Sequence, residues 1–272
     1  MELTKEDLSA LHGKQLELLK LFLDICREHH LRYYLLGGTL LGAVRHQGFI
    51  PWDDDIDVGM LREDYDRFLQ LGQPPLPEGF FLQTHRTDPG FPANFAKLRN
   101  DRTTFVEYSM KDCPIHHGVY IDIFPLDFCP DGPAPVFELK HLLLKLRITD
   151  AFSPGPMKLP TRLLRRLARV CYPSLSGAVA AREQLFRSVP ESNRLANHCG
   201  AWGRKEIMPK AWYGEGAPLT FEGLQVQGPK EYHLWLRQVY GNYHALPPEE
   251  QRVSHHFVYA FDLHNAYPGE SL

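Results

Sequence analysis

The sequence lacks the features of a membrane-spanning, secreted or disulfide-stabilised protein. None of its 272 residues belongs to an apolar run that approaches the roughly 18 residues of a transmembrane helix. The N-terminal run MELTKEDLSALHGKQLELL carries acids where a signal peptide has its basic region, and it has no apolar core. Five cysteines without a CxxC pair argue against a disulfide framework. These absences predict a cytoplasmic protein that folds without cross-links.

Strong net charge and the common catalytic signatures are also absent. The chain has 30 Lys and Arg residues against 33 Asp and Glu residues, a formal net charge of -3. Such a balance argues against a protein that coats nucleic acid through bulk charge, so we expect no nucleic-acid partner. Neither a GxSxG elbow nor a P-loop occurs. No internal repeat or long linker interrupts the chain, and we predict one domain over residues 1–272.

Hydrophobic periodicity predicts an α+β fold. A first amphipathic helix spans 4–30, with Thr4 and Asp7 as a capping box. The predicted strands are 31–36, 56–60, 80–83, 94–99, 103–108 and 119–124. The other predicted helices are 39–45, 63–71, 136–150, 160–172, 178–199 and 230–240. Residues 72–79 and 153–160 are rich in Gly and Pro and read as loops, and 214–230 reads as a Gly- and Pro-punctuated tail.

The most informative stretch is an acidic run that follows Trp52. Asp53, Asp54, Asp55 and Asp57 place four carboxylates within five residues, and these would repel one another unless a cation lies nearby. In a strand, Asp53, Asp55 and Asp57 share one face because side chains alternate. Carboxylates two residues apart suit a hard cation such as Mg²⁺ or Mn²⁺. Asp55 and Asp57 are therefore the predicted metal ligands.

The neighbours of this pair have weaker assignments. Asp53 either joins the metal site or only bounds the strand. Asp54 faces away, and we expect it to pair locally with Arg45 or His46 or to cap a turn. His46 is expected to pack beside Trp52 rather than to donate to a phosphate.

A glycine pair and a lone acid complete the pattern. Gly37 and Gly38 precede a predicted helix, where they would let backbone N–H groups approach a phosphate. Asp122 lies alone in an apolar run, where a carboxylate is costly unless it meets a cation or donors. Its natural partner is a metal held by Asp55 and Asp57, beside which it could also accept the proton of an attacking hydroxyl. Each piece alone is common, but their ordered combination predicts a metal-dependent phosphoryl-transfer site.

The run from 35 to 68, LLGGTLLGAVRHQGFIPWDDDIDVGMLREDYDRF, resembles the signature of the LicD family. This family belongs to the nucleotidyltransferase-fold superfamily and includes the fukutin-related transferases. Further similarity lies in 94–98 with Thr103, 119–127, 221–223, 240–243 and 246–252. The resemblance implies a nucleotidyltransferase-like mixed sheet over about 20–128, a helical insertion over about 131–213, and a C-terminal part over 214–272.

The resemblance also implies an activity. Family members move a phosphorylated alcohol, typically phosphocholine from CDP-choline, to a sugar hydroxyl of a surface glycan such as teichoic acid or lipopolysaccharide, and release CMP; relatives move ribitol phosphate. Catalysis and metal binding would fall to Asp55, Asp57 and Asp122. Substrate binding would fall to five residues: Gly37, Gly38, Thr39, Arg45 and Lys97. Among these, the glycines and Thr39 would cradle the diphosphate, and Arg45 and Lys97 would be cationic supports.

Two other functions remain open. One is a nucleotidyltransferase that attaches a nucleotide to a small molecule, since its site would be nearly the same. The other is an inactive module that binds a glycan or a membrane surface.

A basic segment and a histidine pair lie outside the predicted phosphoryl-transfer site. Residues 140–169 hold eight bases against Asp150 alone, interleaved with leucines. This segment is either a solvated helical face or a peripheral contact with the inner face of an anionic membrane that presents a lipid-linked glycan; periodicity does not decide. His255 and His256 either touch a substrate or belong to a polar terminal turn.

Overall fold

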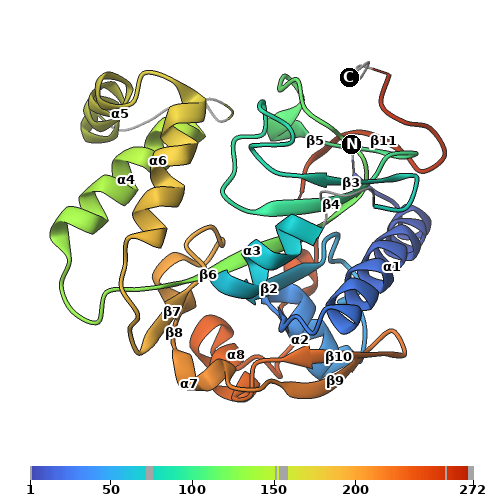
Figure 1. Cartoon of the computed structure of the whole chain (residues 1–272). Helices are drawn as coiled ribbons and strands as arrows, with labels where there is room; N and C mark the ends of the chain where they lie inside the picture. The colour runs from blue at the N-terminus through green and yellow to red at the C-terminus, as the bar shows by residue number, and fades with distance from the viewer. Residues whose placement is uncertain (1, 72–75, 151, 153–158, 255, 269–272) are drawn as a thin grey trace.

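The computed structural model describes residues 2–71, 76–150, 152, 159–254 and 256–268. Its helices are α1 (Lys5–Glu28), α2 (Gly37–His46), α3 (Arg62–Leu71), α4 (Pro135–Thr149), α5 (Leu159–Cys171), α6 (Leu175–Arg187), α7 (Lys210–Tyr213) and α8 (Tyr232–Tyr240) (Figure 1). Its strands are β1 (Tyr34–Leu35), β2 (Asp57–Leu61), β3 (Phe80–Gln83), β4 (Ala96–Asn100), β5 (Thr104–Glu107), β6 (Tyr120–Phe128), β7 (Arg194–Ala196), β8 (Ile207–Pro209), β9 (Ala217–Phe221), β10 (Leu224–Gly228) and β11 (Val258–Asp262).

The central sheet is mixed. Its strands follow the order β1-β2-β6-β4-β3. Strands β2 and β6 run parallel, whereas the pairs β1–β2, β6–β4 and β4–β3 are antiparallel. The far end of β6 also pairs with β7, which in turn pairs with β8. The predicted α+β class with a mixed sheet is confirmed.

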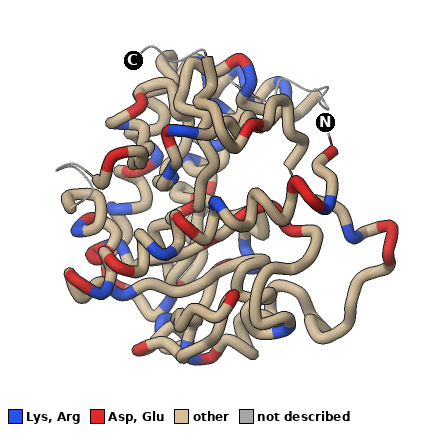
Figure 2. The backbone as a smooth tube through the Cα atoms, turned by 90° about the vertical axis from the view of Figure 1, so that its right-hand side faces the viewer, with Lys and Arg blue, Asp and Glu red and all other residues tan. Residues whose placement is uncertain are grey.

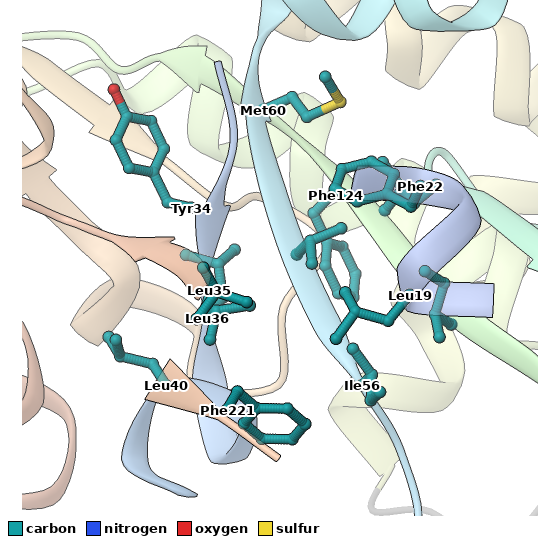
Figure 3. Packing of buried hydrophobic residues seen from close by; sticks show 14 of the residues in the cluster. Leu19, Phe22, Tyr34, Leu35, Leu36, Leu40, Ile56, Met60, Phe124 and Phe221 are labelled. Atoms are coloured by element: carbon teal, nitrogen blue, oxygen red, sulfur yellow. The ribbon is translucent and has the colours of Figure 1, made fainter. Parts of the chain in front are cut away.

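Helix α1 covers one side of this sheet. It begins at the predicted capping box, in which the Thr4 hydroxyl accepts from the Asp7 N–H and the Asp7 carboxylate accepts from the Thr4 N–H. Its buried side chains belong to the main apolar core, where the helix lies against β4 and β6, and Figure 3 shows Leu19 and Phe22 of α1 in this core with Ile56. Burial of one such side chain stabilises a fold by roughly 1.5–3 kcal/mol. The core also contains Ile56 and Val58, and it therefore fixes the end of the acidic run and the start of β2.

Helices α4, α5 and α6 form a separate layer beside the sheet (Figure 1). Leu144 and Ile148 of α4 pack on Ala178 and Val179 of α6 in a small core of their own. In the described part of the chain, no helix is long and apolar enough to cross a membrane. Lysine and arginine positions alternate with acidic ones over most of the backbone (Figure 2).

Some predicted elements differ from the observed ones. The helix predicted over 178–199 is wrong beyond Arg187, because Pro190 follows closely and residues 194–196 pair with β6 as β7. The tail at 214–230 contains the hairpin β9–β10, whose turn places Glu222 and Gly223 at φ +48° and +75°. The polar end contains β11, which pairs with β5. The cores of both predicted loops, 72–75 and 153–158, lie outside the described residues.

Candidate functional site

Three site residues form one row across the sheet. In the parallel register of β2 and β6, Asp57 lies opposite Asp122. In the antiparallel register of β6 and β4, Asp122 lies opposite Lys97. Residues in register on neighbouring strands point to the same face of a sheet, so two carboxylates and one ammonium group gather there. The opposite face at this level is apolar, with Val58 and Ile123 fully buried.

This face forms the wall of a pocket with a volume of about 980 Å³. Seven of the eight predicted site residues line it: Gly37, Gly38, Arg45, Asp55, Asp57, Lys97 and Asp122. Thr39 is not among the lining residues. Its buried hydroxyl instead accepts a hydrogen bond of 2.8 Å from the backbone N–H of Asp57, which ties the start of α2 to the start of β2.

The glycine pair makes room for two carboxylates. Gly37 has φ +52°, and a Cβ atom there would lie 2.7 Å from Asp57 Oδ2. A Cβ atom at Gly38 would lie 2.3 Å from Asp53 Oδ2. Both glycines begin α2, whose N-cap, Leu36, has no side-chain hydrogen bond. The helix therefore directs its first N–H groups toward the pocket beside the acids, where a phosphate would find donors.

The acidic run keeps the predicted alternation although β2 begins only at Asp57. Asp53, Asp55 and Asp57 all line the pocket. The predicted local partner of Asp54 is wrong. Its fully buried carboxylate lies 3.0 Å from the Nδ1 atom of His256 and accepts a 3.2 Å hydrogen bond from the backbone N–H of the same residue. The partner comes from the far end of the chain, which no local pattern could indicate.

Lys97 is enclosed by acids and a ring. Its Nζ atom lies 2.9 Å from Asp122 Oδ1, 3.5 Å from Glu107 Oε2 and 3.2 Å from the centroid of the Tyr120 ring. Only 4% of the residue is exposed. Lys97 thus holds Asp122 from the side opposite to Asp57, and its predicted contact with substrate stays a prediction.

Acids still outnumber bases at the site. Six carboxyl groups gather here: Asp53, Asp54, Asp55, Asp57, Glu107 and Asp122. Among the described residues, the cations that contact them directly are Lys97 and His256. Burial and mutual repulsion raise the pKa of Asp53 and Asp57, and burial raises the pKa of Asp122 against the pull of Lys97. Burial also raises the pKa of Asp55 to about 6.

At two other groups, charged neighbours outweigh the effect of burial on the pKa. Burial would raise the pKa of Glu107, but Lys97 and His256 lower it to about 2. Burial would lower the pKa of His256, but its hydrogen bond to Asp54 and the charge of Glu107 raise it to about 10. His256 is thus a cation at neutral pH, clamped between Asp54, Asp55 and Glu107 at 3.0, 4.0 and 3.6 Å.

The donor set fits a cation. Carboxylates whose pKa is raised by burial and repulsion are stabilised when a metal neutralises them, and hard oxygen ligands suit Mg²⁺ and Mn²⁺. Among the described residues, one group has ligand atoms that all lie within 4.8 Å of one another, namely Asp54, Asp55 and His256. It shares Asp55 with the predicted ligand set, but Asp57 and Asp122 do not belong to it.

Arg45 holds the C-terminal part of the chain at the pocket. Its guanidinium donates to the carbonyls of Tyr243 and Ala245 at 3.0 and 3.3 Å. His46 packs edge-to-face on Trp52, with ring centroids 6.5 Å apart, as predicted.

Two residues of the site were not among the predicted catalytic, metal-binding or substrate-binding residues, although a substrate contact was one of the two readings left open for His256. Glu107 is a single acid at the end of a predicted apolar strand, the same signal that identified Asp122, and it could have been found. His256 reaches the site because β11 pairs with β5, and its sequence context carries no such signal. His255 lies outside the described residues.

The sequence is similar to those of known proteins. Residues 30–131 match the family described as LicD/FKTN/FKRP, nucleotidyltransferase domain. The chain is 31% identical over 258 residues to the lipopolysaccharide cholinephosphotransferase LicD of Haemophilus influenzae, which covers 91% of this chain and 95% of that protein. It is 54% identical over 41 residues to the human ribitol 5-phosphate transferase FKRP, which covers 15% of this chain and 8% of that protein.

Proposed function

The chain belongs to the LicD family of phosphotransferases, and from this membership we propose that it transfers phosphocholine from CDP-choline to a sugar hydroxyl of a cell-surface glycan. The name of the Haemophilus influenzae relative supports choline phosphate as the transferred group and lipopolysaccharide as the kind of acceptor. CMP would be the released product. Over nearly its full length that relative aligns with this chain, which makes it a better guide than the short match to the ribitol 5-phosphate transferase.

The proposed reaction is a displacement at phosphorus. The acceptor hydroxyl oxygen forms a bond to the phosphorus that carries choline, and the bond from that phosphorus to the bridging oxygen breaks. CMP leaves with the electron pair of the broken bond. Asp122 takes the hydroxyl proton, and its raised pKa suits a base that must hold that proton.

Six of the eight predicted residues have a direct part in the proposed reaction, whereas Thr39 and Arg45 hold the surrounding backbone. Asp55, Asp57 and Asp122 would hold Mg²⁺ or Mn²⁺, which would neutralise phosphoryl oxygens and the charge that develops on them. Gly37 and Gly38 open the start of α2 to the diphosphate. Lys97 holds the Asp122 carboxylate in place and opposes the effect of burial on its pKa. Since the transition state spreads charge over several oxygens, this positioning and neutralisation would supply most of the catalysis.

One observation carries the proposal. The in-register row of Asp57, Asp122 and Lys97 lies beside the uncapped start of α2, on the wall of a pocket that can hold a nucleotide. An excess of buried carboxylates needs a cation, and the helix start suits an anion. A metal-bound diphosphate satisfies both at once.

The test is product identification. The protein is incubated with Mg²⁺ and CDP-choline, CDP-ribitol, CDP-glycerol or CTP, and the products are identified by mass spectrometry. We expect CMP from CDP-choline, and a loss of at least about 100-fold in Asp57→Asn, since removal of one preorganised electrostatic group typically costs that much. The exposed loop acid Asp131 provides the matched control, and Asp131→Asn should keep full activity.

Two results would contradict the proposal. Pyrophosphate release from CTP, with the nucleotide retained on an acceptor, would indicate a nucleotidyltransferase. No turnover of any of the four nucleotides, by a protein that still binds a glycan or a vesicle, would indicate an inactive binding module.

A further inference from the structure

One buried arginine of the pocket has neutral hydrogen-bond partners and, among the described residues, no acidic one. Arg182 of α6 is 7% exposed and lines the pocket. Its guanidinium donates to Asn94 Oδ1 at 3.4 Å and to the His198 carbonyl at 3.0 Å, and it lies 3.2 Å from His141 Nε2. All three partners are neutral acceptors. Within the described ranges of the chain, no Asp or Glu forms an ion pair with Arg182.

Two arginines that do not line the pocket each form an ion pair with an acid. Arg62 lies 2.6 Å from Asp127, and Arg187 lies 2.6 Å from Asp66. Arg99 is also buried among neutral acceptors, but it does not line the pocket, and it stacks on Tyr120 at 4.9 Å. A buried cation without a counter-ion costs several kcal/mol. An anion that enters the pocket could provide the missing counter-ion for Arg182.

A second cation lies beside it. Lys145 is exposed, lines the pocket and lies one turn along α4 from His141, the neighbour of Arg182. Within the described residues, Lys145 has no ion-pair partner either. Burial and then the charge of Arg182, with a smaller effect of Lys145, lower the pKa of His141 to about 3. His141 therefore stays a neutral acceptor for Arg182 and adds no charge of its own.

These cations are separate from the acidic site. The aromatic rings of Phe95 and Phe124 also line the pocket, with ring centroids 4.6 Å apart, and the Phe95 ring lies 5.6 Å from Lys97 Nζ. The pocket thus has an acidic end at Asp57 and Asp122 and a cationic end on α4 and α6. A donor phosphate on the acidic site leaves the cationic end for a different anionic group.

We propose that Arg182 and Lys145 form an anion-binding subsite that receives a phosphate or carboxylate group of the acceptor glycan. This inference rests on the proposed function, because it assigns the acidic end to the donor. It predicts that the acceptor is an acidic sugar, and that the subsite orients its hydroxyl toward the metal-binding end.

Binding of two model sugars tests the subsite without any turnover. Isothermal titration calorimetry compares glucose 6-phosphate with methyl α-glucoside. The wild-type protein should bind the phosphorylated sugar at least tenfold more tightly, and Arg182→Gln should abolish that preference. Arg204 lies outside the pocket, is exposed and pairs with Glu138, so Arg204→Gln is the matched control and should keep the preference. Equal affinity of the wild-type protein for both sugars overturns the proposal.

A second variant covers the risk that Arg182→Gln does not fold. Lys145 is exposed, so Lys145→Gln should fold normally, and we expect it to weaken binding of glucose 6-phosphate severalfold. An unchanged affinity in folded Lys145→Gln, together with an unchanged affinity in any folded Arg182 variant, overturns the proposal.

The source of the anion is tested separately. Binding of CDP-choline with Mg²⁺ should be unchanged in Arg182→Gln. If CDP-choline loses affinity by the same factor as glucose 6-phosphate, the subsite serves the donor, and the assignment to the acceptor is wrong. Absence of CMP release by the wild-type protein would contradict the proposed function instead, and the comparison of the two sugars would still be valid.

A different observation supports a second inference. Helix α5 exposes four apolar side chains at spacings of four, four and three residues, which place them on one face. They are Leu159 at 66%, Leu163 at 56%, Leu167 at 47% and Val170 at 79% exposure. On the opposite side, Arg165 and Arg169 bind Asp150 at the end of α4 and hold α5 in place. The apolar face is thus turned away from the rest of the protein.

The charge of α5 indicates what covers this face. The helix contains no acidic residue, and the exposed Arg162 and Arg166 flank the apolar face. An apolar face bordered by arginines complements an anionic phospholipid surface, where such a helix lies in the interface plane. We infer that α5 docks the protein on an anionic membrane. Residues of α4 line the pocket, and Asp150, directly after α4, binds Arg165 of α5. Docking of α5 would therefore bring the cationic end of the pocket close to the membrane.

Vesicle sedimentation tests the docking. The protein should bind vesicles of phosphatidylcholine with phosphatidylglycerol, and high salt should weaken that binding. The double variant Leu163→Ser with Leu167→Ser should lose it, whereas Leu234→Ser, at an exposed leucine of α8, should keep it. Failure to bind anionic vesicles overturns the inference. So does a dimer in light scattering that the double variant converts to a monomer, because a second copy would then cover the face.

Discussion

Asp57 and Asp122 lie opposite each other in the register of two neighbouring parallel strands, β2 and β6. Neighbouring strands lie about 4.8 Å apart, so the backbone holds these carboxylates as close as a sheet allows. Lys97 approaches Asp122 from β4 on the other side. Because no such cation approaches Asp57 within the described part of the chain, we propose that a metal would bind on the Asp57 side of this row.

The Lys97 contact predicts a large effect on stability. Lys97→Met would leave Asp122 without its buried cation and Glu107 with His256 alone, and the loss of such a buried partner typically costs about 3–5 kcal/mol. Urea unfolding without metal should show a loss of this size, and addition of Mg²⁺ should restore part of it. Lys111 pairs with the adjacent, exposed Asp112, so Lys111→Met should change stability by less than about 1 kcal/mol. Equal effects of the two variants would contradict this account of Lys97.

Substitution of either Gly37 or Gly38 by alanine should lower activity, because the added methyl group has no room beside a site carboxylate. Gly38→Ala would place a Cβ atom 2.3 Å from Asp53 Oδ2, and Gly37→Ala would place one 2.7 Å from Asp57 Oδ2 at φ +52°. Both variants should lower kcat by displacing a site carboxylate. Gly13 of α1 has nothing within 4 Å of its Cβ position, and Gly13→Ala should stabilise the protein by roughly 1 kcal/mol at unchanged kcat. Wild-type kcat in Gly38→Ala would show that Asp53 is dispensable.

Metal binding distinguishes two ligand sets that share Asp55. Mn²⁺ binding is measured by titration with electron paramagnetic resonance as the readout. Asp57→Asn should bind Mn²⁺ at least about 10- to 100-fold more weakly than the wild-type protein, because the loss of a residue that only hydrogen-bonds to a metal ligand already lowers affinity by that factor. His256→Gln should bind Mn²⁺ almost as the wild-type protein does, because protonated His256 serves as the counter-ion of Asp54. The reverse order of the two variants would place the metal on Asp54, Asp55 and His256.

Local patterns explain which parts of the site were predictable. Strand alternation and the cost of acids in apolar runs pointed to Asp55, Asp57 and Asp122, because both signals act within a few residues. His256 is 202 residues away from Asp54, and only the pairing of β11 with β5 joins them. Strand β7 was predicted as helix for the same reason, since its partner, β6, lies more than 60 residues earlier. Strand pairing between residues so far apart in the sequence produces no local hydrophobic periodicity from which it could be predicted.

The His256 contacts predict how stability depends on pH. Because Asp54 and Glu107 raise the pKa of His256 to about 10, well above the ordinary value of about 6.5, its protonation stabilises the folded state. This contribution is complete below pH 6.5 and is lost as the pH rises toward 10. The difference in free energy of unfolding between the wild-type protein and His256→Gln should therefore shrink over this range, by at most about 1.4 kcal/mol per pH unit.

Urea unfolding at pH 6, 8 and 10, without metal, measures that difference. The exposed His244 provides the control, and the difference between the wild-type protein and His244→Gln should stay constant with pH. A constant difference for His256→Gln as well would mean that His256 is neutral in the folded protein. Its ring would then be available to a metal together with Asp54 and Asp55, and the pH series and the Mn²⁺ titration would have to agree on that outcome.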